Sequence, residues 1–266
     1  VRVSEIALET ARANIENSGT GSDINVETSL ASLRTSLVSA NASLSAALTE
    51  ADVIIGVENT AANDLYESIL SVYNRTALTE AQGAFIAVRS TQRRAEGMVR
   101  ALNTNSPSAE VLAAGQASLD ALQQATWFLD KVQTVLTNTG TNTALSSTEL
   151  GTKRSAMQTW RSTIATQNTT IGAAVQSLQA SENTRTTTRA QLENAVKTAQ
   201  ANLAIAQANQ RSQVKTAETT IEVQRAALAS AEATLSQRKS PSRFVDLQVL
   251  RAQVQDAQVG YEQAIQ

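Results

Sequence analysis

The sequence predicts an all-α protein made of a long coiled-coil helical hairpin and an antiparallel region built like a four-helix bundle. Apolar residues recur every seven positions through most of the run 146–237, which indicates one very long helix whose narrow stripe another helix must cover. The 266 residues include only 2 Pro and 10 Gly, so few places interrupt a helix. Aromatic residues make up 3%, which favours thin helix-on-helix seams over a thick core.

The first part of the chain predicts two helical segments. An i, i+3, i+4 apolar pattern over 3–17 fits a short N-terminal helix within 1–23, and Gly19, Thr20, Gly21 and Ser22 are expected to end it. A leucine stripe then begins near residue 24 and reaches Ile55, where Gly56 indicates a kink or a stop. Helical pattern resumes up to residue 73, and the pattern leaves open whether 24–73 is one helix or two.

Two further helices complete the predicted bundle. Thr79 with Gln82 resembles a capping box and indicates a helix start, while Ser106 before Pro107 indicates the next. Ser146 with Glu149 is another capping box and opens the long helix. Amphipathic helices joined by short connections fold back on one another, so we expect an antiparallel helical bundle over 24–175. The two tryptophans are expected to anchor its core: Trp127 and Trp160.

The long helix carries its seam in two phases. Ile164, Ile171 and Leu178 begin a series at a spacing of seven that continues through Ala199 and Ala206. After Ala206 the series is offset, as a four-residue insertion produces, and such a stutter locally unwinds a supercoil. The predicted coiled-coil residues of the long helix are Leu192, Val196, Leu203, Val214, Ile221, Leu228 and Leu235.

A turn is predicted near 239–243, because Pro241 cannot continue a helix. The turn residues are expected to be Ser240, Pro241, Arg243 and Asp246. A matching heptad stripe follows the turn, so the segments 216–238 and 245–266 are predicted to pack antiparallel within a coiled-coil region spanning 176–266. The stripe of the second segment consists of Leu247, Leu250, Val254 and Tyr261.

Composition argues against several classes of function. The net charge of −2 and a pI near 5.4 provide no basic field for nucleic acid. The sequence contains no His and no Cys, so the commonest general base and the commonest metal ligands are missing. No phosphate-binding glycine motif is present, and nothing places a Lys beside a Ser in a nucleophile elbow. We therefore expect no enzyme activity, no metal, no cofactor and no small-molecule substrate.

Two polar clusters allow a functional and a structural interpretation. Arg89, Arg93, Arg94 and Arg100 could bind phosphate or an acidic partner, but a solvated helix face is preferred because the chain as a whole is not basic. The polar residues after Gly56 could line a small site, but a helix-capping turn explains them better. These residues are Asn59, Thr60, Asn63 and Asp64.

The C-terminal third resembles the α-helical hairpin domain of periplasmic adaptor subunits, the membrane fusion proteins of the HlyD type. The resemblance rests on the alanine repeats Ala-Asn-Leu-Ala-Ile-Ala-Gln-Ala at 201–208 and Ala-Ala-Leu-Ala-Ser-Ala-Glu-Ala-Thr-Leu at 226–235, followed by the Pro-containing turn and the repeat that begins at Arg251. The segment 51–80 is similar to a bundle insertion in adaptor-like proteins of candidate-phylum bacteria. The lipoyl-like and β-barrel domains of the family are not present in this sequence.

The resemblance implies a non-catalytic structural adaptor of a cell-envelope transport or efflux complex. Such an adaptor forms a homo-oligomer and links an inner-membrane transporter to an outer channel. It also implies an exported protein on the periplasmic or extracytoplasmic side, associated with the membrane through segments outside this chain.

Two other classes remain open at this stage. A stand-alone surface or extracellular coiled-coil protein that forms filaments would share the composition and the heptads. An amphipathic lipid-surface protein is disfavoured, because its helices should place Lys and Arg opposite bulky apolar residues, whereas the apolar side here is mostly Ala.

Overall fold

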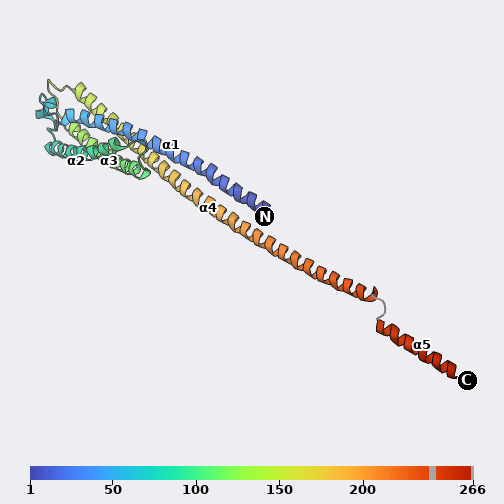
Figure 1. Ribbon diagram of the computed structural model, residues 1–266. Coiled ribbons are helices and arrows are strands. Elements are labelled where there is room, and N and C mark those ends of the chain that lie inside the picture. The colour runs from blue at the N-terminus through green and yellow to red at the C-terminus, as the bar shows by residue number, and fades with distance from the viewer. Residues whose placement is uncertain (240–243, 265–266) are drawn as a thin grey trace. The chain divides into compact units, whose positions relative to one another are not determined.

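The computed structural model describes residues 1–239 and 244–264, and this part of the chain is helical and contains no strand. Its helices are α1 (Arg2–Ile55), α2 (Arg75–Ala101), α3 (Ser108–Thr137), α4 (Ser147–Lys239) and α5 (Phe244–Ala264), as Figure 1 shows. Two short 3-10 helices, η1 (Thr60–Asn63) and η2 (Glu67–Ile69), connect α1 to α2. The predicted all-α class, with a very long helix and packed neighbours, is confirmed.

The chain divides into two compact units. The bundle unit is Ala11–Ala195, and the terminal unit combines Val1–Thr10 with Val196–Gln266. Two helices, α1 and α4, contribute residues to both units, whereas α2 and α3 belong to the bundle unit.

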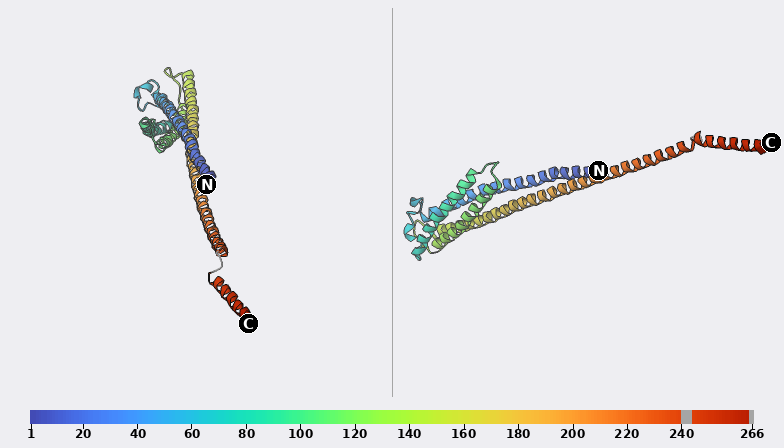
Figure 2. Two further views of the ribbon diagram at one scale, coloured as in Figure 1. Left: turned by 45° about the vertical axis from the view of Figure 1, so that its right-hand side comes forward. Right: turned by 60° about the horizontal axis from the view of Figure 1, so that its bottom comes forward.

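The bundle unit buries one apolar cluster between four helices. In this unit α1 and α4 run side by side in opposite directions, and α2 and α3 pack beside them (Figure 2). The buried residues of the cluster extend in sequence from Val26 to Leu178. The bundle predicted from the sequence was 24–175. On α4 the seven-residue series places four fully buried side chains in the cluster: Met157, Ile164, Ile171 and Leu178.

Close approach of α3 to α4 depends on Gly115. A Cβ atom added at this residue would lie 2.8 Å from Cγ2 of Val175 on α4. On the other side of α3, the rings of Phe85 on α2 and Phe128 pack with centroids 5.5 Å apart. Small residues on one face and rings on another therefore fix α3 between its neighbours.

The predicted break at 19–22 is wrong, because α1 continues through Gly19, Thr20, Gly21 and Ser22 as one helix. Each Gly costs helix stability of about 1 kcal/mol relative to Ala, but packing overrides this local preference. Within the bundle unit, Ser29 hydrogen-bonds Ser181 on α4 at 3.0 Å, and Asp23 forms an ion pair with Arg185. Before the glycines, Ile15 lines a hollow with Leu192 of α4, so α4 lies beside α1 on both sides of Gly19 and Gly21.

The end of α1 at Ile55 is fixed by side chains that satisfy its free backbone groups. Gly56 has φ of +65°, a conformation that suits glycine, and the buried carboxylate of Asp52 accepts hydrogen bonds from the next N–H groups. Val57 and Glu58 donate to Oδ1 of Asp52 at 2.9 and 3.0 Å, and Asn59 donates to Oδ2 at 2.8 Å. The predicted stop at Gly56 is therefore confirmed.

Three side chains also donate hydrogen bonds to the last carbonyl groups of α1. Tyr66 donates to the carbonyl of Val53, and the buried Asn63 donates to that of Ile54. Gln82 donates to the carbonyl of Ile55, so it caps α1 and does not form the predicted capping box with Thr79. Helix α2 begins earlier, at Arg75. For Asn63, the structure confirms the interpretation as a helix cap, because its amide binds the carbonyl of Ile54.

The capping box at the start of α4 is confirmed. Ser146 N–H donates to the Glu149 carboxylate at 2.7 Å, and Glu149 N–H donates to the Ser146 hydroxyl at 3.2 Å. Hydrogen bonds from the backbone N–H and the hydroxyl of Ser146 lower the pKa of Glu149 below its ordinary value of 4.5. Across the same connection, the Arg154 guanidinium donates to the carbonyl of Leu136 and so caps α3.

The prediction that Trp127 anchors the core is wrong, because its side chain is 54% exposed. The Trp127 ring instead makes a cation–π contact with Lys131, whose Nζ lies 5.4 Å from the ring centroid. Trp160 is partly buried and packs against the apolar cluster. Phe85 and Phe128 are fully buried in the core, whereas the expected role of Trp160 is met in part.

Substitution of two glycines should change stability in opposite directions. Gly56→Ala should lower the free energy of unfolding by about 1–3 kcal/mol, because φ is positive and the new Cβ would lie 2.6 Å from Oδ1 of Asn63. Gly83→Ala, in an exposed part of α2 with open space at its Cβ, should raise it by about 0.4–1 kcal/mol. Urea unfolding followed by circular dichroism measures both, and a neutral Gly56→Ala would contradict the cap described for α1.

The capping box should make stability depend on pH with a defined sign. Because the pKa of Glu149 is lowered in the folded protein, its contribution is fully present above the unfolded value of 4.5 and disappears as pH falls through the folded pKa. Glu149→Gln should therefore have a lower melting temperature than the parent at neutral pH, and the difference should vanish in strong acid. A difference that stays constant across this range would contradict an ionised cap.

Candidate interaction surfaces

The most prominent candidate surface is an uncovered apolar stripe at the C-terminal end of α4. Val214, Ile221, Leu228 and Leu235 follow one another at a spacing of seven, and each side chain is between 51% and 59% exposed. This spacing places them on one face of the helix. We call these four residues the α4 stripe. A spaced row of exposed β-branched and leucine side chains is the pattern that another helix covers.

Earlier in the same helix, the seam residues are covered. Leu192, Val196 and Leu203 are half-buried, and Ala199 is buried. In the bundle unit, Leu192 lines the same hollow as Ile15 and Gly19 of α1. The first part of the predicted seam is therefore confirmed as a packing face, and its partner is α1, not the segment after the turn.

A second stripe lies on α5. Leu247, Leu250, Val254 and Tyr261 alternate at spacings of three, four and seven, and all are between 44% and 68% exposed. We call these four residues the α5 stripe. Since both stripes are exposed, the predicted packing of 216–238 against 245–266 is not made by the described residues and stays a prediction.

The predicted turn residues are only partly described. Ser240, Pro241 and Arg243 lie outside the described residues, whereas Asp246 is exposed in the first turn of α5. An acidic residue in this position is favourable beside the free N–H groups of a helix start.

The sequence patterns alone did not single out the apolar residues that lie off the two stripes. Val223 on α4 and Val249 on α5 are each two positions after a stripe residue, and both are more than half exposed. Ile205 is also exposed. The signal that could have identified them is their place outside the seam positions, where a surface helix normally carries polar residues.

Three arginines of the cluster on α2, Arg89, Arg93 and Arg100, form ion pairs within the bundle unit. Arg89 binds Glu58 through Nε and Nη2, and Arg93 binds the same carboxylate at 2.8 Å. Arg100 pairs with Glu96 one turn earlier. These contacts neutralise charge and tie the end of α1 to α2, so the solvated-face interpretation fits the cluster better than a phosphate site.

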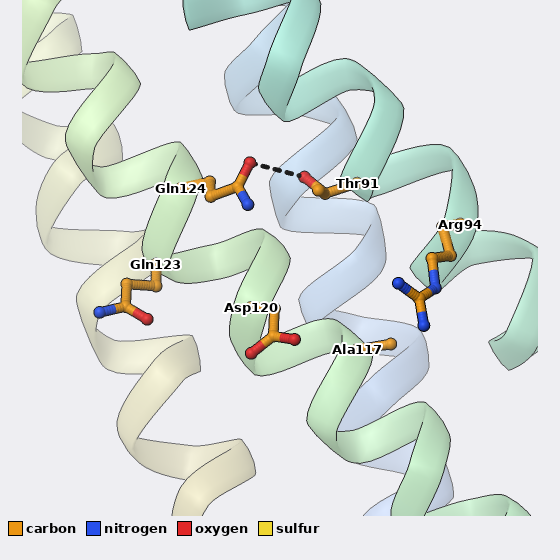
Figure 3. A pocket seen from close by; sticks show the side chains of 6 residues that line it. All are labelled: Thr91, Arg94, Ala117, Asp120, Gln123 and Gln124. Carbon is orange, nitrogen blue, oxygen red and sulfur yellow. Dashed lines mark hydrogen bonds between the residues drawn. The ribbon is translucent and has the colours of Figure 1, made fainter.

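Figure 3 shows a polar hollow between α2 and α3, with a volume of about 220 Å³. Its lining includes Arg94 and Asp120, and Thr91 donates a hydrogen bond to Gln124 at 3.3 Å across it. The hollow offers one cation and one carboxylate but brings no nucleophile beside a base.

The described part of the chain shows neither a cluster of metal ligands nor a membrane-spanning helix. Residues 1–239 and 244–264 contain no group of three or more His, Cys, Asp or Glu side chains placed to hold a metal ion. None of the described helices has the length and apolar character needed to cross a membrane.

Comparisons of the chain with protein-family models, with curated proteins and with solved structures found no match.

Proposed function

We propose that this chain is a non-catalytic structural adaptor of a cell-envelope transport complex, which acts as a helical spacer through helix packing and self-association. The observation that carries the proposal is the pair of exposed apolar stripes on α4 and α5. Heptad stripes lower the free energy only when another helix covers them. The terminal unit exposes two such stripes, so we expect its function to be the packing of these helix faces against other helices.

The chemistry of the side chains supports a role without catalysis. The sequence has no Cys and no His, the commonest general base for activating its plentiful Ser and Thr hydroxyls. Many of these hydroxyls in the described helices instead donate to the carbonyl group four residues earlier, as Thr216 and Thr220 do on α4. Polar residues on the long helices therefore serve solubility and local hydrogen bonding.

Self-association is supported by the apolar residues that lie off the stripes. Val223 and Val249 remain exposed on faces that packing along the stripes does not cover. Alanine-rich helices with such residues gain buried area by packing sideways, and copies arranged around an axis form a closed ring. The resemblance to adaptor subunits supports an inner-membrane transporter and an outer channel as the further partners, and an extracytoplasmic location.

Molecular mass in solution tests the proposal. Sedimentation of the whole chain over a wide concentration range should give one assembly of fixed mass above a threshold, as a closed ring requires. Growth without limit would favour the filament-forming alternative. A monomer at all concentrations would contradict self-association.

A matched pair of variants identifies the surface. Val223→Ser with Val249→Ser should raise the assembly threshold by at least tenfold, because each valine contributes buried area only in the oligomer. The control, Gln237→Ser with Gln248→Ser, changes exposed polar residues on the same helices and should leave the threshold unchanged. Equal effects of the two pairs would show that these valines are not the contact.

A further inference from the structure

The cover of the α4 seam changes within the terminal unit. Val1 and two residues of the first turn of α1, Arg2 and Glu5, line one hollow with Ala206, Asn209 and Gln213 of α4. Leu8 and Ala199, farther along the same seam, are both buried. From Val214 onwards the helix continues with the same spacing of seven, but the α4 stripe is exposed.

We propose that α5 packs antiparallel on the part of the α4 stripe from Ile221 to Leu235 in one defined register. This inference rests on the proposed function in one respect, namely that the stripes are packing surfaces. The occupant of the α4 stripe is then a segment of the same chain. Four residues separate Lys239 from Phe244, a connection length typical of antiparallel helix neighbours.

The register follows from the positions of the apolar residues. When Leu235 is opposite Leu250, heptad geometry also places Ala231 opposite Val254 and Leu228 opposite Ala257. Tyr261 then faces Gln224, and Ala264 faces Ile221. Leu250, Val254 and Tyr261 of the α5 stripe thus meet seam positions of α4, whereas Leu247 lies opposite Arg238. In two layers, Ala231 with Val254 and Leu228 with Ala257, a large side chain faces a small one.

Charges beside the seam distinguish this register from its neighbours. In the proposed register Arg251 lies beside Glu232, which is favourable. A slip of seven residues in one direction would place Arg251 beside Arg225, and a slip in the other direction would place it beside Lys239. Both slipped registers bring like charges together, so charge and apolar spacing select the same pairing.

The pairing also places the two ends of the described chain near each other. Val1 lies beside Asn209, and Ala264 would arrive opposite Ile221, about twelve residues or ~18 Å farther along α4.

Cysteine pairs test the register directly, since the chain contains no Cys. Ala231→Cys with Val254→Cys should form a disulfide within one chain under mild oxidation, because the two residues share a layer. The control, Ala231→Cys with Leu247→Cys, is displaced by one heptad and should react at least tenfold more slowly. Equal rates would overturn the register. A product of dimer mass would overturn the intrachain pairing in favour of a second copy.

A charge exchange tests the contribution of Glu232 and Arg251. In the reactive cysteine pair, Arg251→Glu should slow cross-linking severalfold, and the additional change Glu232→Arg should restore the rate. Failure of the second change to restore it would contradict contact between the two side chains.

Spin labels test the meeting of the two ends. Labels at Arg2→Cys and Glu262→Cys should lie about 20 Å apart if α5 packs back, and beyond ~45 Å if it does not, because the part of α4 from residue 209 to 239 alone has that length. These results are independent of oligomer mass. A monomer that cross-links in register would contradict the proposed self-association and leave this inference intact. An oligomer that fails to cross-link would contradict this inference and leave self-association intact.

Discussion

One constraint governs this structure: α4 is a helix of 93 residues whose apolar side is a narrow stripe, and a narrow stripe is stable in water only when another helix covers it. In the bundle unit, α1 and the core between α2 and α3 provide that cover, and residues such as Ile164 and Leu178 are fully buried. Beyond Ala206 the stripe continues without cover in the structure. The proposed roles of α5 and of self-association both follow from this difference.

The helix ends show how a chain so poor in Pro and Gly makes its turns. Asp52 accepts three backbone hydrogen bonds where α1 ends, and Asn63 and Gln82 satisfy its last carbonyl groups. Arg154 does the same for α3. These polar side chains lie at helix ends, where unpaired backbone groups are costly. Capping therefore accounts for polar clusters that resemble binding sites in the sequence.

The sequence predicted the features that local chemistry determines. The all-α class, the stop at Gly56, and the box formed by Ser146 and Glu149 follow from periodicity, from a glycine and from capping, and each is present. Features that depend on tertiary packing were not predictable. Gly19 and Gly21 remain helical because α4 supports α1, and Trp127 faces solvent because Phe85 and Phe128 fill the core. Periodicity identified the seam at Leu192 and Leu203 but could not name its partner, since a heptad stripe specifies that it needs a helix and not which helix.

Hydrogen exchange along α4 is the most direct measure of whether its whole stripe is covered in solution. If a helix covers the α4 stripe, amides over 214–235 should exchange far more slowly than those of an isolated helix, approaching the protection of 164–178. If amides over 214–235 exchange at the rate of a fraying helix while 164–178 stay protected, the stripe has no partner, and packing is not the function of this surface.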